Sequence, residues 1–223
     1  MYYVAFVHCT DPRYGSSKTG PMTRDENGAR LNVACVNGNF PTVRNLVHSG
    51  TSANFINHYG FTPAICCSWK GRSEILQFIL DEGADAELES NGWTPLIYAA
   101  AHNTYECASM LVNYGVVLDT VDDHDRRGAI WWASRNGNLQ IVQLLVLSGA
   151  NFDVADCTGK TPLIAAKQAN HTAVVAYLTI ELNWKRRRNY ATMLNSLKGA
   201  PTNSKIMRVF QCYDLARLIG TYL

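Results

Sequence analysis

Glycine recurs along this chain at nearly constant intervals. Steps of 33, 32 and 34 residues separate Gly50, Gly83, Gly115 and Gly149. The internal layout repeats as well, because twelve positions before each of these glycines stand Gly38, Gly71, Asn103 and Gly137. A period of this length indicates a stacked array of similar units rather than one continuous globular core.

Each period contains two apolar stretches with helical spacing. The stretch before each recurring glycine shows the i, i+3, i+4 pattern of a helix with one buried stripe, as in Ile75, Leu76, Ile79 and Leu80. An earlier stretch begins with a Thr-Pro pair at Thr62, Thr94 and Thr161. Threonine can cap the free amides of a helix start, and proline is tolerated in the first turn. Every period therefore predicts a helix, a turn, a second helix and a return loop.

These motifs resemble the ankyrin repeat, whose pattern runs Asp-x-x-Gly-x-Thr-Pro-Leu-His-x-Ala-Ala and ends in Gly-Ala. Residues 156–163 match this pattern almost letter for letter, and Gly83-Ala84 and Gly149-Ala150 match its end. The resemblance covers about 155 of the 223 residues. It implies an all-α solenoid of helix-turn-helix units with β-hairpin-like fingers, in five units: 29–61, 62–93, 94–127, 128–160 and 161–182.

The sequence departs from the family pattern at three kinds of position. The family's histidine, which ties neighbouring turns together, is replaced by Asn32, Ile65, Ile97, Trp131 and Ile164. We therefore expect this hydrogen-bond link to be absent from every unit and packing to replace it. The first and fourth units lack Thr-Pro, and Arg126 stands where the finger glycine belongs. These two unit starts are expected to be looser or locally reshaped.

Two flanking segments lack the repeat. Residues 1–28 are rich in turn signals and predict an irregular N-terminal arm. Residues 183–223 predict a helical C-terminal extension, with a last amphipathic helix from Lys205 to Leu223. That helix either caps the open end of the stack or docks an adaptor protein. The tail is also similar to the tails of ankyrin-repeat proteins of single-celled eukaryotes.

Composition limits the class of partner and the compartment. The chain has 47% hydrophobic and 17% charged residues and a net charge of +2, which is typical of a folded protein without a dominant electrostatic partner such as DNA. Its seven cysteines have no Cys-x-x-Cys spacing, which favours free thiols in a reducing compartment. No segment has the features of a signal peptide or a membrane span. We expect a cytoplasmic location, with the nucleus or the soluble face of a larger organelle assembly as alternatives.

Catalytic and metal-binding motifs are missing from the sequence. The six histidines are scattered, and there is no Gly-x-Ser-x-Gly motif or phosphate-binding glycine loop. The acidic cluster from Asp119 to Asp125 lacks the ordered spacing of a calcium loop. We therefore expect neither an enzyme nor a cofactor, a metal or a small-molecule substrate.

Large rings stand at positions that the ankyrin geometry turns toward one concave face, and a stable stack does not require aromatic residues there. The resemblance places them at finger tips and on first helices. Trp, Tyr and Arg dominate the energetics of protein interfaces. We therefore expect a partner-binding site made of Tyr59, Phe61, Trp69, Trp93, Tyr98, Arg127, Trp132 and Arg135. The two arginines could stack on the rings or pair with a partner's carboxylate.

The sequence thus predicts a protein interaction module, a scaffold or adaptor that binds a protein through the concave face of units two to four. It would act as a monomer or in a hetero-complex. Two other roles stay open: an accessory structural subunit of a large assembly, and a substrate receptor of a ubiquitin ligase that uses its C-terminal helix. The basic run from Lys185 to Arg188 leaves a nucleic-acid role as a minor alternative.

Overall fold

The computed structural model describes residues 24–197. The chain divides into two units, Met1–Thr179 and Ile180–Leu223. Most of the expected N-terminal arm, at residues 1–23, and the expected terminal helix, at residues 205–223, lie outside the described residues. The repeat array described below belongs to the first unit.

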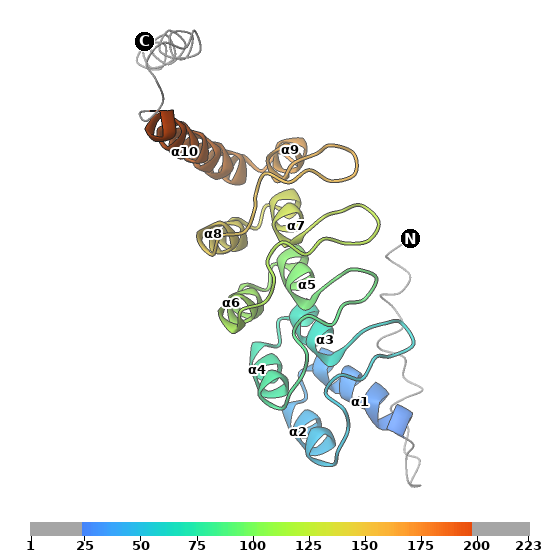
Figure 1. Ribbon diagram of the computed structural model, residues 1–223. Helices are drawn as coiled ribbons and strands as arrows, with labels where there is room; N and C mark the ends of the chain where they lie inside the picture. Colours follow the sequence, from blue (N-terminus) through green and yellow to red (C-terminus); the bar gives the residue numbers. More distant parts are fainter. Residues whose placement is uncertain (1–23, 198–223) are drawn as a thin grey trace. The chain divides into compact units, whose positions relative to one another are not determined.

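The described residues form five consecutive pairs of helices (Figure 1). The first members of the pairs, called inner helices, are α1 (Arg24–Asn37), α3 (Pro63–Lys70), α5 (Pro95–His102), α7 (Ala129–Asn136) and α9 (Pro162–Gln168). The second members, called outer helices, are α2 (Phe40–His48), α4 (Ser73–Asp81), α6 (Tyr105–Tyr114), α8 (Leu139–Leu147) and α10 (Thr172–Leu197). The predicted all-α fold is confirmed. The first helix starts five residues before the expected boundary at 29, and α10 runs without a break past the expected boundary at 182.

The inner helices stack directly on one another, since α3 packs on α5, α5 on α7 and α7 on α9. The outer helices α4, α6 and α8 form a second row beside them (Figure 1). Loops from each outer helix to the next inner helix, called fingers, project on the other side. They span residues 49–62, 82–94, 115–128 and 148–161.

The fingers contain little regular structure. Within the described residues, bridging is limited to the isolated antiparallel pairs Ser90–Trp93 and Val121–Gly128. Each finger is therefore held mainly by its own turn and by the finger next to it.

Threonine caps start three of the inner helices, as the Thr-Pro pairs predict. The hydroxyls of Thr62, Thr94 and Thr161 accept hydrogen bonds from the amides three residues later, at 3.2, 3.3 and 3.4 Å. The fourth unit has Gly128 at this position and no side-chain cap. A Cβ atom there would lie 3.0 Å from the carbonyl oxygen of Thr120. The close approach of finger and helix start therefore explains why this unit departs from Thr-Pro.

The finger turns require a left-handed backbone. Gly92 has φ +76°, and Arg126, one finger later, adopts φ +57° although it carries a side chain. Non-glycine residues pay a steric cost in this region. A Cβ on Gly92 would also lie 2.4 Å from the backbone nitrogen of Asp123. The expected local reshaping of the fourth unit thus takes the form of a left-handed arginine and an uncapped helix.

The expected absence of the inter-unit hydrogen bond is wrong for two units. The Asn32 side chain donates to the carbonyl oxygen of Phe61 at 2.9 Å, and the Trp131 indole N–H donates to that of Lys160 at 3.2 Å. Both acceptors immediately precede the first residue of the next unit. Amide and indole groups are hydrogen-bond donors, so each restores the link without a histidine. Ile65, Ile97 and Ile164, at the same position, have no side-chain donor.

A second series of polar links joins successive fingers at the turn after each outer helix. A side-chain oxygen of one unit accepts a hydrogen bond from a backbone amide about one period later. The pairs are Asn54 with Asp85 at 2.7 Å, Glu87 with Val117 at 2.5 Å, and Asp119 with Asn151 at 2.8 Å. These links satisfy backbone donors that would otherwise be left open in a loop.

The core lies between the two rows of helices. Leu76, Ile79, Leu111, Ile141 and Leu145 of the outer helices are fully buried. Small residues of the inner helices, such as Ala99 and Ala133, lie against them with no exposed surface. Each unit therefore contributes a few large side chains to a continuous core that depends on stacking.

Four cysteines belong to this core as free thiols: Cys35, Cys66, Cys67 and Cys107. Burial raises the pKa of the Cys107 thiol to about 12. Burial, aided by a hydrogen bond with Cys35, raises the pKa of Cys67 well above its ordinary value. The thiols of Cys67 and Cys107 therefore stay protonated at neutral pH, and these side chains pack as small apolar groups.

Candidate protein-binding surface

The aromatic residues predicted as a site lie at two kinds of position. Phe61 and Trp93 end their fingers directly before Thr62 and Thr94, while Trp69, Tyr98 and Trp132 lie on α3, α5 and α7. Because the inner helices stack in register, these positions recur next to one another from unit to unit. The fold therefore brings together rings that are up to about 70 residues apart in sequence.

Five of these rings form a continuous series, called here the aromatic ladder: Trp69, Phe61, Tyr98, Trp93 and Trp132. The ring centroids are 6.4 Å apart for Trp69 and Phe61, and 5.8 Å for Phe61 and Tyr98. The series continues from Tyr98 to Trp93 at 5.1 Å and from Trp93 to Trp132 at 4.8 Å. Stacked, tilted and edge-on pairs at these separations are favourable ring geometries.

Every ring of the ladder is half-buried. Trp131, which precedes the last ladder residue, is by contrast 6% exposed and belongs to the core. Packing between the rings covers part of their area but leaves the rest of each ring open. The ladder is thus a preformed apolar surface across units two to four.

His102 extends the ladder toward the end of α5. Its ring lies 6.1 Å from that of Trp69 and 6.4 Å from that of Tyr98. The Lys70 ammonium lies 3.9 Å from the centre of the Trp69 ring, a cation–π contact. Partial burial lowers the pKa of His102, and the charge of Lys70 lowers it further. Two basic groups therefore lie close together at this end of the ladder.

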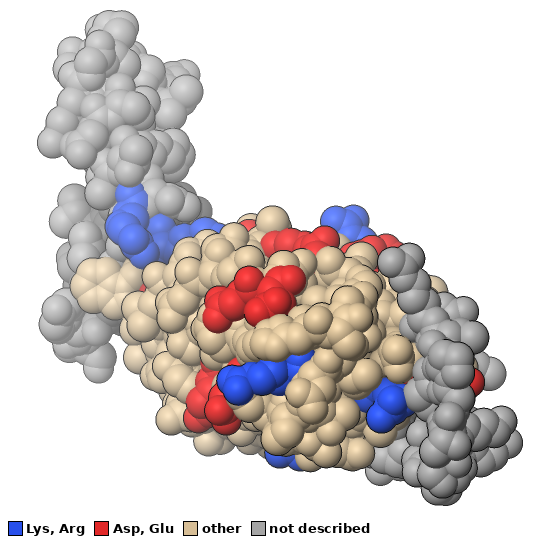
Figure 2. Space-filling view, turned by 90° about the horizontal axis from the view of Figure 1, so that it is seen from below, with Lys and Arg blue, Asp and Glu red and all other residues tan. Residues whose placement is uncertain are grey.

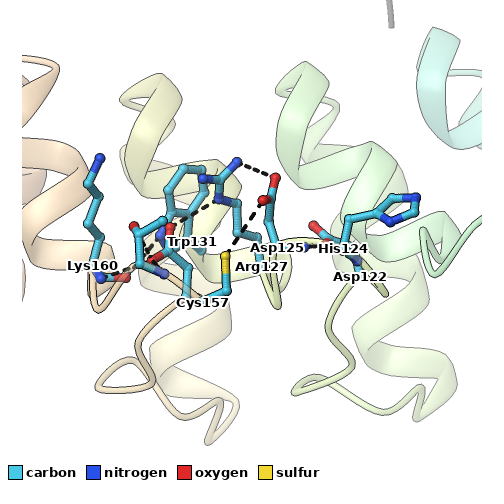
Figure 3. Close-up of polar contacts among 9 residues, drawn as sticks. Asp122, His124, Asp125, Arg127, Trp131, Cys157 and Lys160 are labelled. Carbon is cyan, nitrogen blue, oxygen red and sulfur yellow. Dashed lines mark hydrogen bonds and ion pairs between the residues drawn. The ribbon is translucent and has the colours of Figure 1, made fainter. Parts of the chain in front are cut away.

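Arg127 lies at the other end, within a network of polar contacts between two fingers (Figure 3). Its guanidinium lies 4.2 Å from the Trp131 ring centre and 5.8 Å from that of Trp132. It also donates to Asp125 at 2.7 Å and to Asp156 at 3.1 Å. Arg127 is thus paired with two carboxylates of its own chain, and its pairing with a partner's carboxylate stays a prediction.

Asp156 anchors this network from the next finger, residues 148–161. Its carboxylate accepts hydrogen bonds from the amides of Thr158 and Lys160, both at 2.9 Å, and from the Thr158 hydroxyl at 2.7 Å. Burial alone would raise the pKa of Asp156, but these bonds and the one from Arg127 outweigh it and hold the pKa at about 2. The network fixes the finger that carries Arg127 and thus the rings beneath it.

Besides Arg127, two predicted site residues lie outside the ladder. Tyr59 packs against His58, with ring centroids 3.8 Å apart. Arg135 is exposed in the last turn of α7, one helical turn after Trp132. The ladder partner His102 and the carboxylates of Asp125 and Asp156 were not among the predicted site residues. Opposite charges one period apart, as in Arg127 and Asp156, were the signal that could have revealed this pairing.

Charges do not form a single-sign face on the side of the molecule shown in Figure 2. Acidic and basic residues lie there in small separate groups, and most of the described surface carries neither. Within residues 24–197, no group of three or more His, Cys, Asp or Glu side chains is arranged to hold a metal ion. In the same range, the helices are too short or too polar to cross a membrane.

Comparison with known proteins identifies the repeat. The family model described as ankyrin repeats (three copies) matches residues 31–122 and 119–189. An ankyrin repeat and KH domain-containing protein of Caenorhabditis briggsae is 27% identical over 153 residues, which cover 66% of this chain and 6% of that protein. The B-cell lymphoma 3 protein homolog of Mus musculus is 28% identical over 154 residues, covering 66% of this chain and 34% of that protein.

A shorter relative matches part of the array. Cyclin-dependent kinase inhibitor 2A of Monodelphis domestica is 29% identical over 109 residues, covering 49% of this chain and 64% of that protein. This chain thus spans less than two thirds of the length of each of these three relatives.

Proposed function

Because the chain belongs to the ankyrin-repeat family, whose members generally mediate protein–protein interaction, we propose that it is a non-enzymatic scaffold or adaptor. It binds a protein partner through the concave face of units two to four. The binding surface is the aromatic ladder, with Arg135 at its edge and Arg127 as the residue that positions Trp132. Tyr59 adds a ring at the finger of the second unit.

The half-buried state of the ladder carries this proposal. A large ring has on the order of 150–250 Å² of surface, of which the ladder leaves a part open to a partner, and Tyr and Trp side chains are frequent interface hot spots. The rings hold one another in place, with Trp93 and Trp132 only 4.8 Å apart at their centres. A partner therefore meets a preorganised surface, and little conformational entropy is lost on binding.

The names of the relatives agree with a role of this kind. The opossum relative is named as an inhibitor of a cyclin-dependent kinase, which is an action on another protein. For this chain we propose the same general mode, the rigid display of a surface, with a partner of its own.

A matched pair of tyrosines in the third unit tests the proposal. Tyr98 belongs to the ladder, whereas Tyr114 lies at the end of the outer helix α6 and is 54% exposed. The full chain, Tyr98→Ala and Tyr114→Ala would each be used as bait for affinity purification with mass spectrometry. We expect Tyr98→Ala to lose a partner that the other two baits retain, with an affinity loss of about 2 kcal/mol.

Thermal unfolding of the same proteins completes the test. If Tyr98→Ala keeps the partner but lowers the melting temperature strongly, the ladder serves stability and the proposal fails.

Deleting residues 205–223 tests the two alternative roles, a ubiquitin-ligase substrate receptor and an accessory structural subunit. Loss of one partner without loss of stability would indicate a docking helix of the ubiquitin-ligase type, and a partner that never dissociates on gel filtration would indicate an accessory subunit.

A further inference from the structure

Basic residues recur at the ends of the inner helices. The last turn of α3, α5, α7 and α9 contains Lys70, His102, Arg135 and Lys167, respectively. The last turns of the outer helices α4, α6 and α8 contain none. On α2, His48 lies 3.8 Å from Glu82 and so has an acidic neighbour. From α3 to α9 the pattern therefore distinguishes the inner row of helices from the outer row, whereas the inner helix α1 has no basic residue in its last turn.

Three of these residues, Lys70, His102 and Arg135, called here the basic row, border the aromatic ladder. Lys70 covers the Trp69 ring, and the His102 ring packs against Trp69 and Tyr98. Arg135 follows Trp132 by one helical turn on the same helix. Because α3, α5, α7 and α9 stack on one another, their C-terminal ends lie along one edge of the ladder.

The fingers form the other edge of the ladder, and their charges are mostly acidic. Glu89, Asp123 and Asp125 lie in the fingers that precede α5 and α7. An inner helix of eight residues separates this edge from the basic row by about 12 Å, at 1.5 Å per residue. Arg127, the finger cation beside the ladder, is neutralised by Asp125 and Asp156. The ladder thus has a basic edge and an acidic edge.

From this arrangement we infer the chemistry of the partner, an inference that rests on the proposed function. The partner segment carries aromatic or aliphatic side chains that cover the ladder and acidic side chains that meet the basic row. Its carboxylates point toward the C-terminal ends of the inner helices. The specificity-determining residues on this chain are Lys70 and Arg135, and His102 contributes charge only when it is protonated.

Helix stability offers a simpler reason for cations at these places, because a basic residue at a helix C-terminus interacts favourably with the helix dipole. That reason applies equally to the outer helices α4, α6 and α8, which have no basic residue in the last turn. The charge of Lys70 also lowers the pKa of His102, so the two groups repel each other when both are charged. An anionic side chain bound between them would relieve this repulsion.

Charge complementarity favours a protein segment over a nucleic acid. A nucleic acid carries phosphates at regular intervals and would meet the acidic finger edge as well as the basic row. The net charge of the chain is only +2. A polypeptide can place acidic groups on one side of an apolar stretch and avoid the fingers.

The experiment selects ligands from a random peptide library displayed on phage, with the full chain as target. Peptides whose binding is lost in Tyr98→Ala are sequenced, synthesised and titrated. We expect them to combine acidic with aromatic or aliphatic residues and to bind less tightly as ionic strength rises. Ladder-dependent peptides without enriched acidic residues would overturn the inference and leave the proposed function intact. Peptides whose binding is unaffected in Tyr98→Ala would contradict the proposed function itself.

Charge reversal provides the second arm. Arg135→Glu, at an exposed position, is expected to weaken peptide binding about tenfold or more, since a like charge replaces an attractive one. Arg44→Glu, at an exposed position of the outer helix α2, is the control and leaves the affinity unchanged. A charge reversal at Arg135 that lowers only the melting temperature would show that the basic row serves the helix dipole.

An oligouridylate is the final probe. If it competes with the selected peptides at physiological salt, the partner class is a nucleic acid and the inference is overturned.

Discussion

The indole nitrogen of Trp131 lies 3.2 Å from the carbonyl oxygen of Lys160 and joins α7 to the finger before α9. The indole N–H of the next residue, Trp132, is buried and has no hydrogen-bond partner among the described residues. Two adjacent tryptophans thus differ in what their N–H groups do, and this difference can be measured.

We expect Trp131→Phe to destabilise the protein by about 1 kcal/mol more than Trp132→Phe. Both changes remove similar volume, but only the first breaks a hydrogen bond, while the second removes a buried donor that has no partner. Urea unfolding of the two variants is the measurement. Equal destabilisation would mean that the Trp131–Lys160 bond contributes nothing to stability.

Asp156 makes stability depend on acid pH. Its pKa is about 2 in the folded protein and about 3.9 in an unfolded chain. A group whose pKa is lowered by folding stabilises the protein above the unfolded pKa, and this contribution is lost as the pH falls toward the folded pKa. Asp156→Asn should therefore cost about 2 kcal/mol at pH near 7, and the difference from wild type should shrink between about pH 4 and pH 2.

Denaturant titrations at several pH values test this expectation. Asp123→Asn, at an exposed position of the neighbouring finger, is the control. A gap between wild type and Asp156→Asn that stays constant down to pH 2 would contradict the assigned role of the carboxylate.

Alanine substitutions at two finger glycines can distinguish the cost of a left-handed backbone from the cost of steric overlap. Gly92 and Gly159 have similar φ values, +76° and +80°. A Cβ on Gly92 meets the backbone of Asp123 at 2.4 Å, whereas on Gly159 it meets nothing within 4 Å. Gly159→Ala should cost about 1–2 kcal/mol from the left-handed backbone alone, and Gly92→Ala clearly more. Thermal unfolding of both variants is the measurement. Equal losses of stability in the two variants would show that adjacent fingers can move apart freely.

The described cysteines should differ in reactivity toward iodoacetamide. Cys35, Cys66, Cys67 and Cys107 are buried, and Cys157 is exposed. Under native conditions we expect only Cys157 of these five to be alkylated. Partial desolvation and the Asp125 carboxylate raise the pKa of Cys157, so its reaction should accelerate as the pH increases. Peptide mapping by mass spectrometry is the measurement, and rapid labelling of Cys67 in the native state would contradict the burial of the thiol group.

Local chemistry made much of the fold predictable. The Thr-Pro pairs predicted capped inner helices because a hydroxyl and a proline act within one helical turn. The link through Trp131 was missed because the position was judged by the absence of histidine, whereas the structure requires only a donor at that place. Arg126 could be recognised as unusual, but its left-handed backbone follows from the finger turn and not from its own preference.

The sequence indicated which residues form the candidate site, but it did not indicate which of their side chains are in contact. The repeat register indicated which rings face away from the core. Which ring meets which depends on the spacing of successive units and on side-chain rotamers, so the approach of Trp93 to Trp132 could not be derived. The pairing of Arg127 with Asp156 joins residues almost one period apart, and only stacking brings them together.

The short separation of Trp93 and Trp132 has an optical consequence. Two indoles with centroids 4.8 Å apart couple their electronic transitions, so the far-ultraviolet circular dichroism of the protein should contain an exciton couplet from this pair. Because Trp93 lies in the finger before α5 and Trp132 lies on α7, that signal disappears when these two neighbouring layers of the array separate. The intensity of this signal therefore reports whether the middle layers of the array are packed together.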